Sequence, residues 1–293
     1  MTDAQLLEII ARAEREGWTE LDLSGNDLEV LPTEIGRLQS LEKLILGKWD
    51  DKRERKGNRL TAIPQEIFQL TNLKELYIAN NQISVIPESI AQLAWARQVE
   101  NLAKQQTVSQ FDLNQLKAAI HNILRLSENA EDVKRVPEML LSLGGHFLIV
   151  PHLSKTYLDG AAFYLGEHPV IALTMRYDRI DAFWFTLMYE FGHHIVARHQ
   201  GSYLDVLGNL AITDEESEAN QLAANWLINP LALQEFVVKH QPQFSRKEIE
   251  QFAHSQKRYL GIILGRLHND QLVPHKNLRA LLAKVSSFQK VTD

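Results

Sequence analysis

The first 94 residues repeat one spacing of leucine and asparagine three times. The fullest copy is LKELYIANNQISVIP at 73–87, and shorter copies are LDLSGNDLEVLP at 21–32 and LIL at 44–46 followed by NRLTAIP at 58–64. Asn58 and Asn81 lie 23 residues apart, whereas Asn26 and Asn58 lie 32 apart. The excess of nine residues matches the charged run KWDDKRERK at 48–56, which indicates an insertion. A regular period of this length predicts stacked structural repeats.

This pattern resembles leucine-rich repeats, so we expect a short solenoid over residues 1–94. About three repeats are the minimum for a stacked core, and their ends need caps. The amphipathic segment 3–16 predicts a helix that caps one end. The repeats can serve as a surface for a protein partner or protein substrate, or as a stabilising cap for the neighbouring domain. For the charged insertion we expect a solvated loop with internal ion pairs rather than a nucleic-acid patch.

From about residue 94 the repeat pattern stops, and residues 95–293 predict a second domain of the α+β class. Helices are expected at 94–106, 111–127 and 130–143, as a connector and first scaffold. Three short strands follow, at 146–150, 160–165 and 170–174, separated by proline and glycine turn signals. A buried helix at 181–198 comes next. Further helices are expected from about 213 and near 231–239, 245–255, 260–267 and 276–284.

The helix at 181–198 reads DAFWFTLMYEFGHHIVAR, and its first half is almost wholly apolar. A helix of this composition is buried nearly all round. Burying the carboxylate of Glu190 or the imidazoles of His193 and His194 is unfavourable unless these groups are paired or bind a metal. Glu190 and His194 are four residues apart, so an ordinary ion pair between them is one explanation.

The spacing around Glu190 suggests a metal site. Two histidines bind zinc in the motif H-E-x-x-H, and its glutamate acts as general base. Here Tyr189 stands in the place of the first histidine and His193 in the place of the second. Glu216 is the candidate third ligand, with Asn220 on the same helix face to orient it. Thr213 and Glu216 also have the spacing of a capping box, which is the alternative role for that glutamate.

The run DAFWFTLMYEFGHH, together with ESEAN and LINP further on, resembles the ImmA/IrrE family of metallopeptidases. The resemblance covers about residues 132–282 and includes HFLIVPHLSKTYLDGAAFYL, PVIALTMRYDRID and LGIILGRL. Within this family, the sequence resembles the branch that is usually fused to helix-turn-helix antitoxins. In this chain the repeats stand in the place of that DNA-binding part. The resemblance implies a small zincin-like α+β domain, with Glu190 as general base and His193 and Glu216 as zinc ligands. The family's first zinc-binding histidine falls on Tyr189.

Replacing that histidine has a chemical consequence. A phenol must lose a proton, at an unperturbed pKa near 10, before it binds zinc as an anion. A Tyr189 phenolate or a recruited His194 are the two ways to complete the site, and neither is favoured. We therefore expect a zinc metallopeptidase-like protein with a degenerate site, weakened or inactive, whose repeats recruit a protein partner. The alternative is an active zinc endopeptidase that cleaves a regulatory protein chosen by the repeats.

Composition restricts which metal ligands, binding partners and cellular locations are expected. The chain has no cysteine, so any metal must bind to histidine, carboxylate or phenolate. The formal charge of −6 gives no general attraction to nucleic acid or anionic membranes. Without a signal-peptide pattern or an apolar run of roughly 20 residues, a cytoplasmic protein with no membrane segment is expected.

Overall fold

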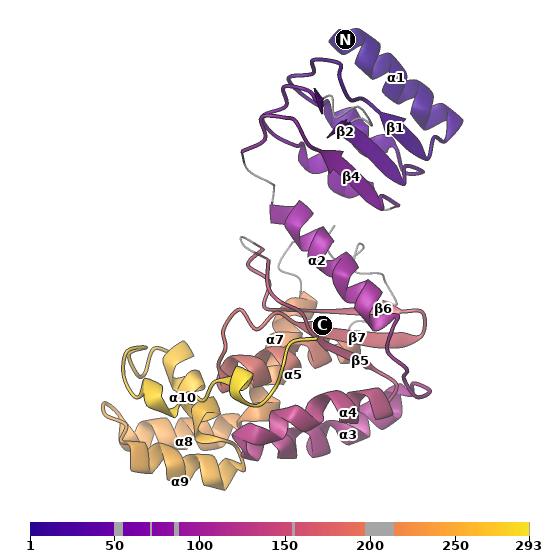
Figure 1. Cartoon of the computed structure of the whole chain (residues 1–293). Coiled ribbons are helices and arrows are strands. Elements are labelled where there is room, and N and C mark those ends of the chain that lie inside the picture. Colours follow the sequence, from indigo (N-terminus) through magenta and orange to yellow (C-terminus); the bar gives the residue numbers. More distant parts are fainter. Residues whose placement is uncertain (50–54, 71, 85–87, 154–155, 197–213, 293) are drawn as a thin grey trace. The chain divides into compact units, whose positions relative to one another are not determined.

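The computed structural model describes residues 1–49, 55–70, 72–84, 88–153, 156–196 and 214–292 (Figure 1). The chain divides into two compact units, Met1–Ala94 and Trp95–Asp293. Each unit is described by itself below. None of the helices within the described residues is both long and apolar enough to span a lipid bilayer.

The first unit begins with the predicted amphipathic helix, α1, Asp3–Glu16. Thr2 caps it: its side chain accepts a hydrogen bond from the Gln5 backbone, and the Gln5 side chain accepts one from Thr2. The helix ends at Gly17, whose φ of 65° is a conformation that glycine adopts without strain. The helix buries Leu6 and Ile10 against the leucines of the repeats. The predicted capping helix is therefore confirmed.

Parallel strands form the sheet of this unit, in the order β1 (Glu20–Asp22), β2 (Lys43–Trp49) and β4 (Glu75–Ile78). The 3₁₀ helices η1 (Thr33–Arg37) and η2 (Gln65–Gln69) follow the first two repeat strands and pack against each other. Each strand places its leucines in the core between sheet and 3₁₀ helices.

The repeated asparagines close the turns after the strands. The buried Asn58 side chain donates to the carbonyls of Leu23 and Leu46, at 2.9 and 2.7 Å, and accepts from the amides of Asn26 and Leu28, at 3.0 and 3.1 Å. One side chain thus satisfies four backbone groups, which explains why the repeat needs asparagine there.

The charged insertion differs from the predicted loop. β2 continues into it, and β3 (Arg55–Lys56) pairs antiparallel with the end of β2, so the described part forms a hairpin. The ammonium of Lys48 forms an ion pair with Asp22 of the first repeat. Residues 50–54 lie outside the described part of the chain.

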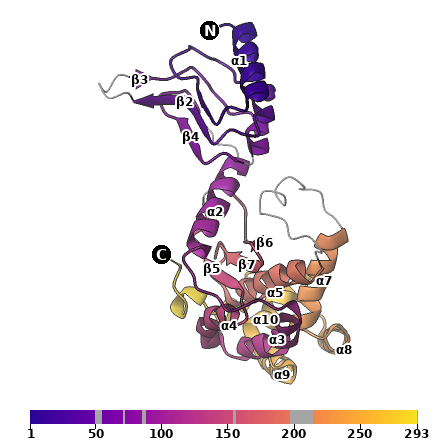
Figure 2. The same ribbon diagram turned by 90° about the vertical axis from the view of Figure 1, so that its right-hand side faces the viewer.

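The second unit is an α+β structure (Figures 1 and 2). Its sheet has the order β5 (His146–Ile149), β7 (His168–Leu173) and β6 (Gly160–Leu165), with β5 parallel and β6 antiparallel to β7. The helices, with their bounds, are α2 (Glu88–Ala103), α3 (Leu113–Arg125), α4 (Val136–Ser142), α5 (Ile180–Val196), α7 (Asp214–Leu227), α8 (Pro230–His240), α9 (Arg246–Gln256) and α10 (Leu260–Asn269).

The sheet lies between two helical layers. One face, with Phe147 and Ile171, joins the core around α5, and the other, with Leu148 and Ala172, packs on the residues of α2 from Trp95 onward. The three predicted strands and the buried central helix are thus present, with ends shifted by a few residues.

Two helix predictions were wrong. Residues 130–143 form a 3₁₀ segment, Ala130–Arg135, and then α4, because Pro137 has no backbone N–H and fits only the first turn of a new helix. Near 276–284 the chain forms only the short 3₁₀ helices Arg279–Leu281 and Val285–Ser287. Leu278, with a φ of 56°, breaks the expected helix.

Candidate functional site

The site is built on α5, the central helix of the second unit. Phe183, Trp184, Leu187 and Phe191 are at most 2% exposed, so α5 is buried on most of its surface, as its composition predicts. It packs against β6, β7, α7 and α10. The polar residues of its second half are therefore held on a rigid scaffold, and each faces a defined neighbour.

A close crossing of α5 and α7 brings the distant residue Glu216 to this helix. A Cβ atom at Gly192 would lie 2.9 Å from the Cα of Ala219, so only glycine permits this approach. Ala219 is fully buried at the crossing. Glu216 precedes Ala219 by about one helical turn. Its carboxylate contacts Tyr189 and His193, which lie on either side of Gly192 along α5.

Three predicted ligand positions come together at this crossing. The hydroxyl of Tyr189 donates a hydrogen bond to Oε2 of Glu216. Nε2 of His193 lies 3.7 Å from the other carboxylate oxygen, Oε1. The rings of Tyr189 and His193 meet edge to face, with centroids 4.6 Å apart. The phenol thus occupies the position next to both the imidazole and the carboxylate.

The environment keeps the Tyr189 hydroxyl protonated. Burial raises its pKa above the ordinary value of a phenol, and the hydrogen bond to the Glu216 carboxylate raises the pKa further. At neutral pH the group at this position is a neutral hydrogen-bond donor. Tyr189 therefore interacts with the Glu216 carboxylate as a hydrogen-bond donor, and the two groups do not act as two anionic ligands of one cation.

Glu190, the predicted general base, is buried one residue further along α5. It is 4% exposed, and its Oε1 atom lies against Gly160 at the start of β6. Burial raises the pKa of Glu190 well above its ordinary value, and the nearby carboxylates of Glu216 and Asp159 raise the pKa in the same direction. A carboxyl group perturbed in this way is typical of functional sites.

His194 does not join the other ligand positions. Its Nε2 forms a 3.1 Å hydrogen bond with the carbonyl oxygen of Val170 on β7, and its ring packs on Tyr164. Burial lowers the pKa of His194 to about 4, so the imidazole is neutral. The ion pair with Glu190 is therefore wrong. In this arrangement His194 faces the sheet, and its role as the alternative ligand stays a prediction.

The remaining predicted positions lie at the edge of the site or beyond the described part. The side chain of Asn220 is exposed on α7. Thr213, the other half of the suggested capping box, lies outside the described residues. Among the described residues, no three histidine or carboxylate side chains lie close enough together to hold a metal ion.

Sequence reasoning did not single out Asp159, which influences the pKa of Glu190. Partial burial raises the pKa of Asp159 itself, and the guanidinium of Arg176 opposes that rise. In the sequence, Asp159-Gly160 reads only as a turn signal. The pairing of β6 with β7 brings Gly160 opposite Leu173 and thereby places both charged residues near α5.

Comparisons with known proteins match the first unit. Residues 18–38 and 56–95 match leucine-rich-repeat families. Mouse podocan is 41% identical over 76 residues, which are 25% of this chain and 11% of podocan. The chain thus spans about a tenth of the length of this relative. The matched segments contain β1, β4 and the three repeated asparagines, Asn26, Asn58 and Asn81, which confirms the prediction from the repeated spacing: residues 18–38 and 56–95 are leucine-rich repeats.

Proposed function

We propose that this chain is a partner-recruiting protein built on a metallopeptidase-like domain of the ImmA/IrrE type whose zinc site is degenerate. The hydrogen bond from Tyr189 to Glu216 carries the proposal. In the H-E-x-x-H arrangement, the side chains at positions 189, 193 and 216 would be the ones to hold a metal. Here the phenolic proton joins two of these three side chains directly.

The donor set supports a lost or weakened metal. Zinc binds thiolate, neutral imidazole or carboxylate, and a site with three protein ligands needs a donor of such a type at all three positions. His193 and Glu216 meet that need, whereas Tyr189 would have to release a proton that burial and the carboxylate both stabilise. The residues present therefore do not fit a tight catalytic zinc, and we assign no hydrolytic step to them.

The repeats offer the recruiting surface. On the exposed side of their sheet, the ammonium of Lys43 lies 3.8 Å from a carboxylate oxygen of Glu20 and of Glu75, in one row across the strands. Tyr77 is 44% exposed beside this row, and its hydroxyl donates to Glu75. An exposed tyrosine next to paired charges has the chemistry of a protein interface, where aromatic side chains supply much of the binding energy.

The test is capture of a partner by the full chain, from extracts of cells that express it. Tyr77→Ser should release the partner, whereas Arg37→Ser, on the exposed side of η1, should retain it. The captured partner should stay intact during incubation with added zinc. Equal retention by the Tyr77→Ser variant would contradict recruitment through this face.

An active zinc endopeptidase is the second candidate, and one observation favours it. The 3.7 Å between Nε2 of His193 and Oε1 of Glu216 is close to the roughly 3.3 Å that separates two ligands of a tetrahedral zinc. In this case the captured partner would be cleaved when zinc is added. Glu190→Gln would then abolish cleavage and leave partner capture unchanged, because Glu190 lies in the other unit.

A further inference from the structure

Two histidine side chains, His268 and His275, lie next to each other at the C-terminal end of α10. His268 is the second-last residue of that helix, and His275 lies in the turn that begins at Pro274. The centres of their rings are 5.2 Å apart, and the ring planes are inclined by 53°. Neither residue belongs to the site around Tyr189 and Glu216 described above.

One nitrogen of His268 is buried without a hydrogen-bond partner. The side chain is 1% exposed, and its Nε2 lies 3.1 Å from the carbonyl oxygen of Asn277. Because a carbonyl only accepts, Nε2 carries the proton, and Nδ1 presents a lone pair that no group within the described residues satisfies. Burial lowers the pKa of His268 below its ordinary value, which keeps the imidazole neutral. A buried acceptor without a partner is unfavourable, and a bound ion removes that penalty.

The hydrogen bond on Nε2 is the one that a metal ligand needs. Histidine ligands donate their other ring N–H to a carbonyl or carboxylate group, which fixes the tautomer and the orientation of the ring. The carbonyl of Asn277 accepts this bond from His268, and the Asn277 amide closes the turn by donating to the carbonyl of Pro274 at 2.8 Å. His275 is exposed in the same turn, so an ion can reach the pair from solvent.

The spacing of the two rings fits a shared metal ion. A metal about 2.0–2.1 Å from an imidazole nitrogen lies about 3.2 Å from the ring centre, so two rings on one tetrahedral metal have centres roughly 5 Å apart. The observed 5.2 Å agrees with this value. A second histidine pair, His146 and His168, is wider, at 6.0 Å, and in the described part of the chain neither of its rings has an enclosed nitrogen without a partner.

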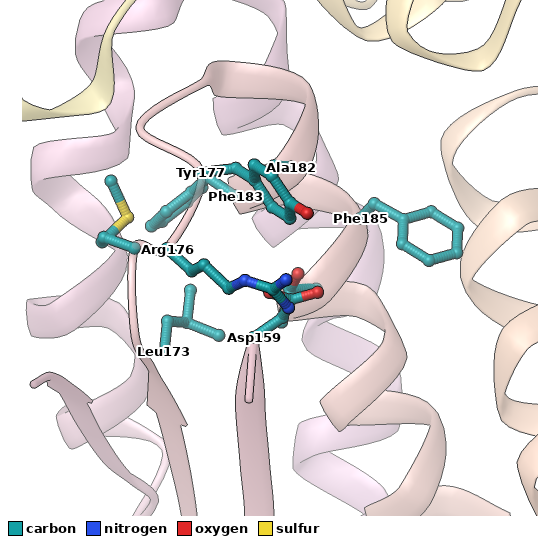
Figure 3. Close-up of a pocket in the computed structure, with 9 residues that line it drawn as sticks. Asp159, Leu173, Arg176, Tyr177, Ala182, Phe183 and Phe185 are labelled. Carbon is teal, nitrogen blue, oxygen red and sulfur yellow. The ribbon is translucent and has the colours of Figure 1, made fainter. Parts of the chain in front are cut away.

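The charged neighbours of His268 largely cancel. The carboxylate of Asp181 and the guanidinium of Arg179 act on its pKa in opposite directions, and the two groups form an ion pair with each other. Lys276 is exposed, so solvent screens its charge. Ala182, the residue after Asp181, lines the pocket at the start of α5 that Figure 3 shows, whereas neither Asp181 nor His268 lines it. The histidine pair is therefore separate from that pocket.

We propose that His268 and His275 form an open binding site for a divalent first-row transition metal ion. Nδ1 of His268 and one ring nitrogen of His275 are the protein ligands, and water fills the remaining positions. Imidazole suits zinc, nickel and copper, and copper(II) binds most tightly of these ions. Among the residues that the structure describes, no third histidine or carboxylate is close enough to join the pair, so zinc binds here more weakly than at a site with three protein ligands.

The test is titration of the metal-free full chain with copper(II), with a competing chelator to measure the affinity. The chain carries His193→Ala, which removes a ligand position of the site on α5. We expect one copper(II) per chain, and electron paramagnetic resonance should show hyperfine splitting from two imidazole nitrogens. Nickel(II) and zinc(II) should bind more weakly, following the general order of affinities.

His275→Ala locates the site, because this side chain is exposed and its removal should leave the metal-free melting temperature unchanged. The copper(II) affinity should fall at least tenfold, since loss of even a hydrogen-bond partner of a metal ligand costs about 10–100-fold. His168→Gln, in the second histidine pair, is the matched control and should bind copper(II) as the parent chain does.

Three results would overturn the proposal: no copper(II) binding up to about 1 mM, undiminished binding by His275→Ala, or an equal fall in affinity for His168→Gln. The proposal does not rest on the proposed function. Because His193→Ala is present throughout, failure of copper(II) binding leaves the zinc affinity of Tyr189→His and the capture of a partner as separate tests of that function.

Discussion

The hydrogen bond between Tyr189 and Glu216 can be measured as a coupling free energy. Tyr189→Phe removes only the hydroxyl, and Glu216→Ala removes the acceptor, so the two single variants and the double variant form a cycle. A hydrogen bond to an ionised group contributes about 1.5–3 kcal/mol. Because the Glu216 side chain is 41% exposed, solvent weakens the bond, and we expect a coupling of about 1 kcal/mol.

The assay is urea unfolding of the full chain at pH 7, followed by tryptophan fluorescence in the presence of a chelator. Two units can unfold separately, so the transition of the second unit must be identified first. Leu187 is fully buried in that unit, and Leu187→Ala should lower its stability by about 2–5 kcal/mol. The transition that moves in this variant is the one to analyse in the cycle.

A matched cycle provides the control. Tyr164 packs on His194 at the sheet, and within the described residues it forms no hydrogen bond with Glu216. Tyr164→Phe combined with Glu216→Ala should therefore give additive effects. A coupling below about 0.3 kcal/mol between Tyr189 and Glu216, within the usual scatter of additivity, would refute the assignment of this bond.

Three further expectations follow from contacts in each unit. Burial raises the folded-state pKa of Glu190, so the wild-type chain loses stability as the pH rises from the unfolded-state pKa of this group towards its folded-state pKa. The side chain in Glu190→Gln does not ionise, so the melting temperature of this variant should rise relative to that of wild type between pH 5 and 8. A constant difference between the two melting temperatures would contradict the raised pKa. Asn58→Ala removes four hydrogen bonds and should destabilise the repeats by about 2–4 kcal/mol in urea unfolding, while Asn72→Ala, at an exposed site, should change little. Gly192→Ala forces a Cβ atom towards Ala219 and should lower the stability of the second unit by about 1–3 kcal/mol, although alanine has the better helix propensity. A variant more stable than wild type would refute the close crossing of α5 and α7.

The periodic parts of the fold were predictable because each repeat position has one physical task. Asn58 must satisfy four backbone groups, and the leucines of the strands must fill the core beneath them. The helix with residues 189 and 193 on one face follows from spacing in the same way. Such features depend on neighbours within one element or one repeat, which a sequence displays directly.

Other parts depend on contacts between distant residues. His194 lies only one position after His193, but the carbonyl of Val170 on β7 draws it towards the sheet. Asp159 and Arg176 come together because β6 and β7 pair. The hairpin of the insertion and the break at Leu278 likewise reflect pairing and backbone geometry that have no periodic signal.

In the proposed function, Tyr189 takes the place of the metal. The most direct measurement is zinc affinity, by competition with a chromogenic chelator, for wild type, Tyr189→His and Tyr189→His with His193→Ala. We expect no tight zinc in wild type, one zinc per chain in Tyr189→His, and loss of that zinc in the double variant. One tightly bound zinc per chain in the wild-type protein, lost on His193→Ala, would contradict a degenerate zinc site and favour the active peptidase.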